Sequence, residues 1–222
     1  MILLGIAPCT AMVLVFSYLA RGMMGLTLVL VALNSLTMLV LYAPLGNFLL
    51  DVGGISIPFE TIFFSVMLYV GVSLVAGYVT RTQLIRRRGI QWYETSFLKP
   101  MGTISMAALI LTLVYIFMLQ GDVMIDNPLS VAMVAIPLTL QIFLIFTIGL
   151  VLSKVLKLTY EEAAPVSLIG TSNHFEVAIA TAVMVFGIGR GAAFATVVGV
   201  LIEVPVMLLL VTILLRYRVR FP

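Results

Sequence analysis

Long apolar runs separated by short, charge-bearing connections form the dominant pattern of this chain. A helix needs about 20 apolar residues to cross the hydrocarbon core of a bilayer. Continuous runs of this kind predict helices, because a membrane β-barrel shows alternating segments of about ten residues. The seven predicted spans are Ile2–Ala20, Gly25–Leu50, Pro58–Thr80, Pro100–Leu119, Pro128–Leu152, Ala163–Gly187 and Gly191–Leu215.

The composition supports a lipid environment. Hydrophobic residues make up 63% of the chain and charged residues only 9%, whereas a soluble domain carries about 25% charged residues. The sequence therefore predicts an all-α integral membrane protein. The net charge of +3 is interpreted as basic residues at helix ends, with membrane lipids and not nucleic acid as partners. A single cysteine excludes an intramolecular disulfide and a cysteine-based zinc site.

The charged residues predict how the helices are oriented. Eleven of the twelve basic residues fall on one set of helix ends and connections, which by the positive-inside rule is cytoplasmic. The opposite side holds only Arg190 among the basic residues, together with Asp51, Asp122 and Asp126. We therefore expect a multi-pass plasma-membrane protein with its N-terminus outside and its C-terminus in the cytoplasm. The basic residues of the cytoplasmic side are Arg21, Arg81, Arg86, Arg87, Arg88, Lys99, Lys154, Lys157, Arg216, Arg218 and Arg220.

Two segments interrupt the apolar pattern in a similar way. Residues Gly5–Met12 and Ala164–Glu176 both contain proline and polar residues where a span should be continuously apolar. Each is followed by a long helix with one buried polar residue, Asn34 in the first case and Glu203 in the second. Interrupted helices at matching positions of two halves are typical of inverted-repeat transporters and of their binding sites.

This internal repeat also predicts the domain organisation. Residues 1–222 form a single transmembrane domain, in which 58–216 is a five-helix repeat and 1–50 is the end of a first repeat. Three helices of that first repeat would precede Ile2. Met1 is followed directly by apolar residues, without the basic region and cleavage site of a signal peptide. An odd number of spans with an external N-terminus and no signal peptide fits a fragment.

Two acidic residues, Glu176 and Glu203, are buried in predicted spans. A charge at membrane depth costs roughly 2.5–3.5 kcal/mol on insertion scales and is a functional candidate for that reason. Burial disfavours the charged form, so either carboxyl group could hold a proton and release it when water arrives. The alternative is a structural hydrogen bond between helices. His174 would share a cavity with Glu176 if the helix is unwound near Asn173, or would simply pair locally.

Cys9 and two buried amides are the remaining candidates. A lone intramembrane cysteine is most often a packing residue, but Cys9 follows Pro8 in an interrupted segment, and a thiolate is a soft ligand. Asn34 and Asn173 can bind an ion or a substrate, or can join helices by hydrogen bonds. No phosphate-binding loop, zinc-protease motif or nucleophile elbow is present in the sequence. The sequence therefore predicts no enzyme, no ATP-driven pump and no cofactor.

Three motifs resemble those of the arsenite efflux permeases, which belong to the bile acid/arsenite/riboflavin transporter superfamily. Residues Gly5–Val13 resemble the cysteine motif of these permeases, Ser172–Ala178 their second signature and Ala195–Leu208 their last span. The resemblance runs across essentially the whole chain. It implies a ten-helix fold of two inverted five-helix repeats, of which this chain is the last seven helices, with two broken helices crossing at the substrate site.

The resemblance also implies roles for individual residues. The essential cysteine of the family falls on Cys9, its essential glutamates fall on Glu176 and Glu203, and an important asparagine falls on Asn34. Some members carry arginine just before the cysteine, where this chain has Pro8, so no charge role is carried over to that position.

The mechanism implied by the resemblance is extrusion of arsenite, with antimonite as a second candidate, in exchange for protons. Cys9 would bind the arsenic of this metalloid, Asn34, Asn173 and His174 would line the substrate site, and Glu176 or Glu203 would load the proton. Two alternatives remain open. One is a sodium-coupled importer of organic anions in the same superfamily, and the other is a membrane subunit that transports nothing.

Overall fold

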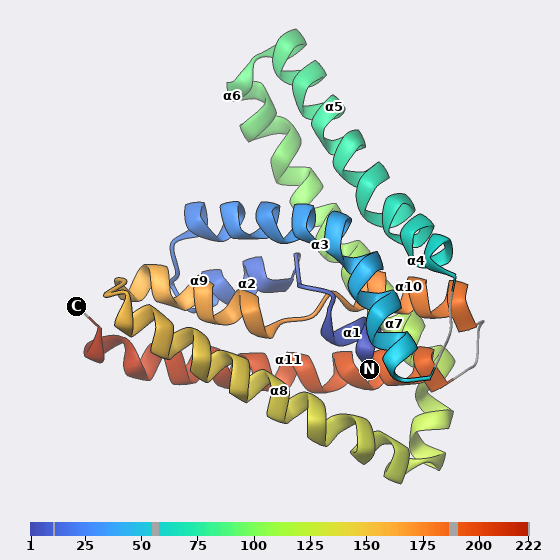
Figure 1. Ribbon diagram of the computed structural model, residues 1–222. Coiled ribbons are helices and arrows are strands. Elements are labelled where there is room, and N and C mark those ends of the chain that lie inside the picture. The colour runs from blue at the N-terminus through green and yellow to red at the C-terminus, as the bar shows by residue number, and fades with distance from the viewer. Residues whose placement is uncertain (11, 55–57, 187–190, 222) are drawn as a thin grey trace.

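The computed structural model describes residues 1–10, 12–54, 58–186 and 191–221, and these residues are almost entirely helical. The β-structure within the described ranges is one isolated β-bridge. The expected all-α membrane fold is confirmed (Figure 1). The elements are α1 (Ile2–Gly5), α2 (Met12–Leu19), α3 (Met24–Val52), α4 (Phe59–Val66), η1 (Met67–Gly71), α5 (Val72–Arg88), α6 (Ile90–Trp92), η2 (Tyr93–Phe97), α7 (Leu98–Asp126), α8 (Pro128–Val155), α9 (Tyr160–Thr171), α10 (Phe175–Phe186), α11 (Gly191–Tyr217) and η3 (Arg218–Arg220).

Four continuous helical stretches are long and apolar enough to cross a membrane among the residues described: Met24–Val52, Phe59–Arg88, Pro128–Val155 and Phe194–Tyr217. The second of these is α4, η1 and α5 joined without a break. Its central π-helical turn, η1, widens the helix where it passes α3 and the site described below. All four stretches fall on predicted spans.

The two spans with interrupted sequence are broken helices. The first predicted span becomes α1 and α2, separated by residues 6–11. The span predicted over Ala163–Gly187 becomes α9 and α10, separated by Ser172, Asn173 and His174. A capping box fixes the start of α9, because the Glu162 side chain accepts hydrogen bonds from the Thr159 backbone N–H and hydroxyl. These bonds hold the pKa of the exposed Glu162 carboxyl below its ordinary value.

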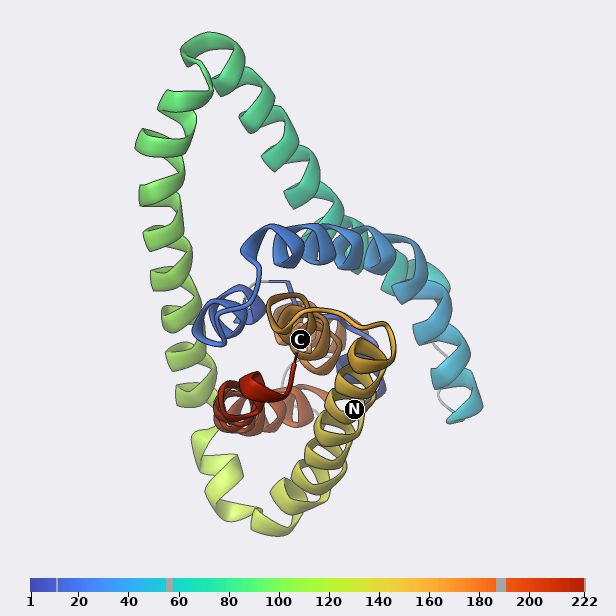
Figure 2. The same ribbon diagram turned by 90° about the vertical axis from the view of Figure 1, so that its left-hand side faces the viewer.

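The long helices enclose the broken ones. Helix α8 packs closely along α9, and α11 packs against α8 and α10 (Figure 1). The approach of α8 to α9 depends on Gly149, since a Cβ atom there would lie 3.0 Å from the Ser167 Cα. By contrast, α5 and α7 form a long hairpin through α6 and η2 that stands out from the other helices (Figures 1 and 2). No described side chain of α5 is buried.

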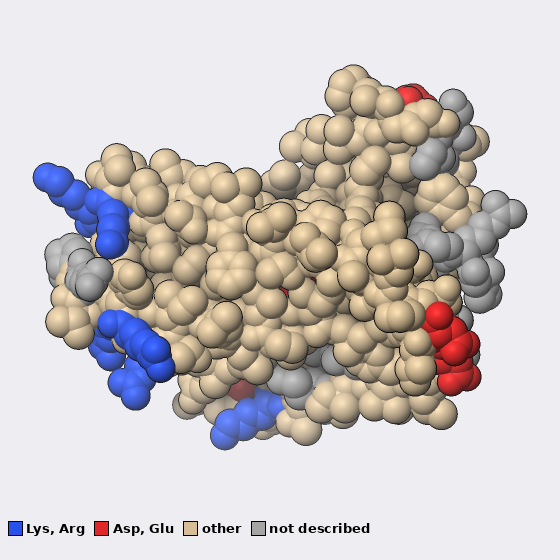
Figure 3. All heavy atoms as spheres, turned by 90° about the horizontal axis from the view of Figure 1, so that it is seen from below, with Lys and Arg blue, Asp and Glu red and all other residues tan. Residues whose placement is uncertain are grey.

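Charged side chains are unevenly distributed over the surface of the molecule. In the view of Figure 3 several lysine and arginine side chains lie at the end that holds the C-terminus, and acidic side chains lie at the other end, while a further basic group with an acidic neighbour lies midway between them. At the basic end, the Lys154 ammonium lies 5.4 Å from the ring centroid of Phe221, and the Arg218 guanidinium lies 5.5 Å from that of Tyr160. The Tyr160 hydroxyl donates to the Ala20 carbonyl, which ties α9 to the end of α2. Which end faces the cytoplasm stays a prediction, and Arg190 lies outside the described residues.

Candidate functional site

The two broken helices cross at their unwound segments and pair there as a short antiparallel bridge between Pro8 and Asn173. The Cys9 N–H donates to the Ser172 carbonyl at 3.0 Å, and the His174 N–H donates to the Ala7 carbonyl at 2.7 Å. In this pattern Pro8 and Asn173 form the pair that exchanges no hydrogen bonds with each other. Proline lacks an N–H and loses nothing at such a position. Each unwound segment therefore satisfies some of the backbone hydrogen-bonding groups of the other.

Helix α3 fastens the first unwound segment. The Asn34 side-chain amide donates to the Cys9 carbonyl at 3.4 Å. One end of α1 is held in the same way, because the buried Tyr42 hydroxyl donates to the Leu3 carbonyl at 2.8 Å. The Cys9 side chain is only 3% exposed. In this conformation the thiol therefore faces the protein interior and not lipid.

Helix α11 fastens the second unwound segment. Glu203 is 1% exposed, and its Oε1 accepts a hydrogen bond from the Ser172 hydroxyl at 2.5 Å and another from the Asn173 N–H at 2.9 Å. The buried Oε2 of Glu203 has no partner among the described residues, and neither does the Asn173 side-chain nitrogen. A carboxyl group on a continuous helix thus holds the backbone of a broken one.

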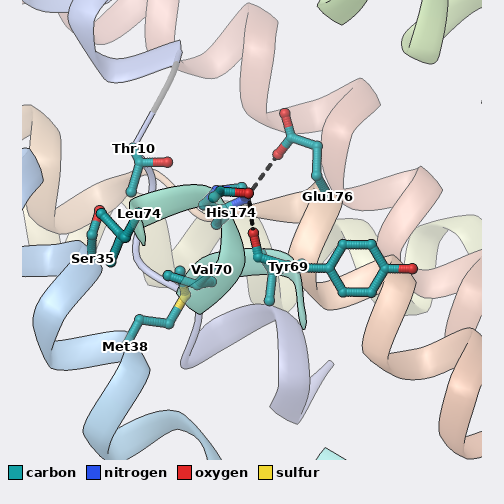
Figure 4. A pocket seen from close by; sticks show the side chains of 10 residues that line it. Thr10, Ser35, Met38, Tyr69, Val70, Leu74, His174 and Glu176 are labelled. Carbon is teal, nitrogen blue, oxygen red and sulfur yellow. Dashed lines mark hydrogen bonds and ion pairs between the residues drawn. The ribbon is translucent and has the colours of Figure 1, made fainter. Parts of the chain in front are cut away.

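A first pocket of about 340 Å³ lies on one side of the crossing, between α3, η1 and α10. His174 and Glu176 both line it, and the His174 Nδ1 lies 2.9 Å from the Glu176 Oε2 (Figure 4). The side chains are 15% and 32% exposed, respectively, so the pair is only partly enclosed. We call this cavity the acidic pocket. Its other lining residues are Thr10, Ser35, Met38, Tyr69, Val70, Ser73, Leu74 and Val177.

A second pocket of about 260 Å³ lies on the other side of Met38, which lines both cavities. Its described lining residues carry no charge, and its polar side chains are amides and hydroxyls. We call it the amide pocket. It is lined by Gly5, Ile6, Pro8, Asn34, Thr37, Met38, Leu41, Tyr42, Leu45, Gly170, Ser172 and Asn173.

The unwound segments form the partition between the two pockets. Pro8 lines the amide pocket and Thr10 the acidic one, while Cys9 lies between them and lines neither. The second segment divides in the same way, with Asn173 in the amide pocket and His174 in the acidic pocket. A movement of either segment would therefore change both cavities at once and would expose the Cys9 thiol.

All six residues predicted for the site gather at this crossing, but they occupy three different places. Asn34 and Asn173 line the amide pocket, His174 and Glu176 line the acidic pocket, and Cys9 and Glu203 are enclosed. Sequence reasoning missed several hydroxyl groups at the site. Ser172 and Thr10 stand beside predicted residues in the interrupted segments, which was a usable signal. The hydroxyls on α3 gave no signal, because isolated Ser, Thr and Tyr residues are common in spans; they belong to Ser35, Thr37 and Tyr42.

Comparison with known proteins places this chain among membrane transporters. Residues 1–127 match the model of the Sodium Bile acid symporter family. The chain is 55% identical to an uncharacterized transporter of Synechocystis. The alignment covers all of this chain and 58% of that protein. It is 45% identical to an arsenical-resistance protein of Alkaliphilus metalliredigens, again over all of the chain and 62% of the relative. An arsenical-resistance protein of Corynebacterium glutamicum is 36% identical over 95% of the chain and 60% of the relative.

The chain thus spans about three fifths of the length of these relatives. No solved structure matches it.

Proposed function

This chain belongs to the Sodium Bile acid symporter family, and on that premise we propose that it forms the substrate path of an arsenite carrier that works in exchange for protons. The family is one of symporters, so the chain is part of a transporter and not an enzyme. The resemblance to arsenite efflux permeases is confirmed by the two arsenical-resistance relatives. The observation that carries the proposal is the position of Cys9, enclosed between an uncharged pocket and an acidic one.

The amide pocket suits arsenite, which is a neutral trihydroxide at cytoplasmic pH. The Asn34 and Asn173 side chains offer donors and acceptors for its hydroxyl groups. When the unwound segments part, the Cys9 thiol replaces one arsenite hydroxyl, so that one As–S bond forms and one water molecule leaves. Water reverses the step and releases arsenite. A single soft ligand permits this release, whereas several thiols would hold the arsenic too tightly.

The acidic pocket suits the proton. Glu176 is partly exposed and paired with His174, the only histidine of the chain, so the pair can take up a proton from water and return it. A proton that moves inward releases about 2.3 kcal/mol per 100 mV of membrane potential. The site takes up a proton on the external side as it releases arsenite there, and it gives the proton up on the cytoplasmic side before it binds the next arsenite. The energy of the proton therefore drives the neutral solute outward.

A second candidate is the sodium-coupled importer of organic anions, which the name of the matching family favours. A cationic side chain in the binding site would favour an organic anion. Neither pocket contains lysine or arginine among the residues that line it. The amide pocket is therefore better matched to a neutral solute.

Everted membrane vesicles that contain the complete protein test the proposal. We expect an acidic lumen to drive accumulation of radiolabelled arsenite, by about tenfold for each pH unit if one proton exchanges for one arsenite. A protonophore should collapse the accumulation, and excess antimonite should compete if it is also a substrate. A sodium gradient without a pH gradient is the control and should give no accumulation. Uptake that follows sodium and ignores the pH gradient would overturn proton exchange.

A further inference from the structure

We infer that Glu203 is a positioning residue: through the Ser172 hydroxyl it holds the two broken helices in register around Cys9, and it does not itself carry the transported proton. The inference rests on the proposed function, because it assigns separate tasks to the two buried carboxyl groups. It also adds Ser172, which lies between Glu203 and the bridge, to the residues on which transport depends.

A continuous chain of contacts joins α11 to the thiol-bearing segment. Glu203 Oε1 accepts from the Ser172 hydroxyl and from the Asn173 N–H. The Ser172 carbonyl in turn accepts the Cys9 N–H. One carboxyl oxygen on a rigid helix thus fixes the backbone on both sides of the crossing.

The position of Glu203 is poor for a proton carrier and good for a support. A group that loads and unloads a proton must meet water in some part of the cycle. Glu203 is 1% exposed and lines neither pocket. Two donors occupy its Oε1, and its unpaired Oε2 is buried away from water. Glu176 differs in both respects, since it lines the acidic pocket and is partly exposed.

Glutamine at position 203 separates the two roles. Its amide oxygen can still accept from Ser172 and from the Asn173 N–H, but it cannot carry a proton. Alanine at the same position removes the acceptor altogether. At position 172, alanine removes the donor, whereas threonine keeps it, and the extended backbone of Ser172 (φ −90°, ψ 138°) suits a β-branched residue.

Ser167 provides the matched control. It is a serine in α9 that is almost completely buried, as Ser172 is. Its hydroxyl donates to the Ala163 carbonyl of its own helix. Substitution of Ser167 with alanine removes a hydroxyl group of the same kind without touching the crossing. It should leave both measurements described next unchanged.

The experiment uses the complete protein in membranes and reads two quantities for each variant. The first is the rate at which N-ethylmaleimide alkylates Cys9, followed by mass spectrometry of the peptide that contains it. The second is arsenite uptake into everted vesicles under a pH gradient. For Glu203→Ala and Ser172→Ala we expect alkylation to become at least about tenfold faster and uptake to fall at least about tenfold. For Glu203→Gln and Ser172→Thr both quantities should stay within about threefold of the wild type, because the acceptor or the donor is kept.

Two results would overturn the inference. One is loss of uptake in Glu203→Gln together with alkylation as slow as in the wild type, which would make the proton at position 203 essential. The other is wild-type behaviour of Ser172→Ala in both measurements. If the wild type itself takes up no arsenite, the proposed function fails, but the alkylation rates still decide whether Glu203 holds the crossing. Gel filtration of each variant confirms that it folds. If Ser172→Ala does not fold, the comparison of Glu203→Ala with Glu203→Gln still tests the inference.

Discussion

Replacement of Cys9 with serine is expected to abolish arsenite uptake while leaving the fold unchanged. Serine keeps the backbone N–H that donates to the Ser172 carbonyl, and its side chain is slightly smaller than that of cysteine. It offers a hard oxygen in place of the soft sulfur that arsenic prefers. We expect uptake to fall at least about 100-fold, which corresponds to a loss of about 2.7 kcal/mol of stabilisation.

Everted vesicles give the uptake rate for this variant, and thermal unfolding in detergent checks the fold. Ser17→Ala is a suitable control, because Ser17 is buried on α2 and its hydroxyl pairs with Thr27, away from both pockets. Its uptake should remain near that of the wild type. If Cys9→Ser transports arsenite at the full rate, the thiol has no part in the mechanism and Cys9 is a packing residue.

Replacement of Glu176 with glutamine is expected to uncouple arsenite movement from the proton gradient. The glutamine side chain fills the same space and can still form a hydrogen bond with His174, but it cannot bind and release a proton. Accumulation driven by an acidic lumen should therefore disappear, so that the internal and external arsenite concentrations become equal. Exchange of labelled for unlabelled arsenite at equal concentrations should persist, because it requires no net proton movement.

The comparison of driven accumulation with equilibrium exchange makes this test specific. A variant that merely misfolds would lose both activities. Glu60→Gln is the control, since Glu60 is an exposed acidic residue in the first turn of α4 and lines neither pocket. Full accumulation by Glu176→Gln would show that the acidic pocket does not load the proton. A membrane subunit that transports nothing would tolerate glutamine at this position, but neither it nor its variant would accumulate arsenite.

The apolar runs were sufficient to predict the helical membrane fold, because lipid requires every backbone polar group to be satisfied within its own segment. Proline alone was a poor guide to where the helices break. Pro44, Pro137, Pro165 and Pro205 all lie inside helices, whereas Pro8 lies at a break. The segment around Pro8 differs because its backbone forms hydrogen bonds with the segment around Asn173. The local sequence does not reveal this distant partner.

The candidate site was predicted residue by residue, but its internal arrangement was not. A polar residue in an apolar run indicates that a partner exists without saying which one. The Asn34 amide meets a carbonyl 25 residues earlier, at Cys9, and Glu203 meets Ser172, which precedes it by 31 residues. The pairing of His174 with Glu176 was easier to foresee because the two are close in sequence. The division into two pockets depends on the crossing itself and could not be read from the sequence.

The crossing of the two unwound segments is the feature on which the account depends, and a disulfide between them tests it most directly. Pro8 and Asn173 form an antiparallel pair that exchanges no hydrogen bonds, and the Cα atoms of such a pair lie about 4.5 Å apart. This distance is within the range that a disulfide bridges. We would introduce cysteine at both positions in the Cys9→Ser background, oxidise the membranes and search for the cross-linked peptides by mass spectrometry. The account predicts a disulfide in the double variant and none in either single variant. Failure of the two cysteines to join would show that the broken helices do not meet there and would contradict the account.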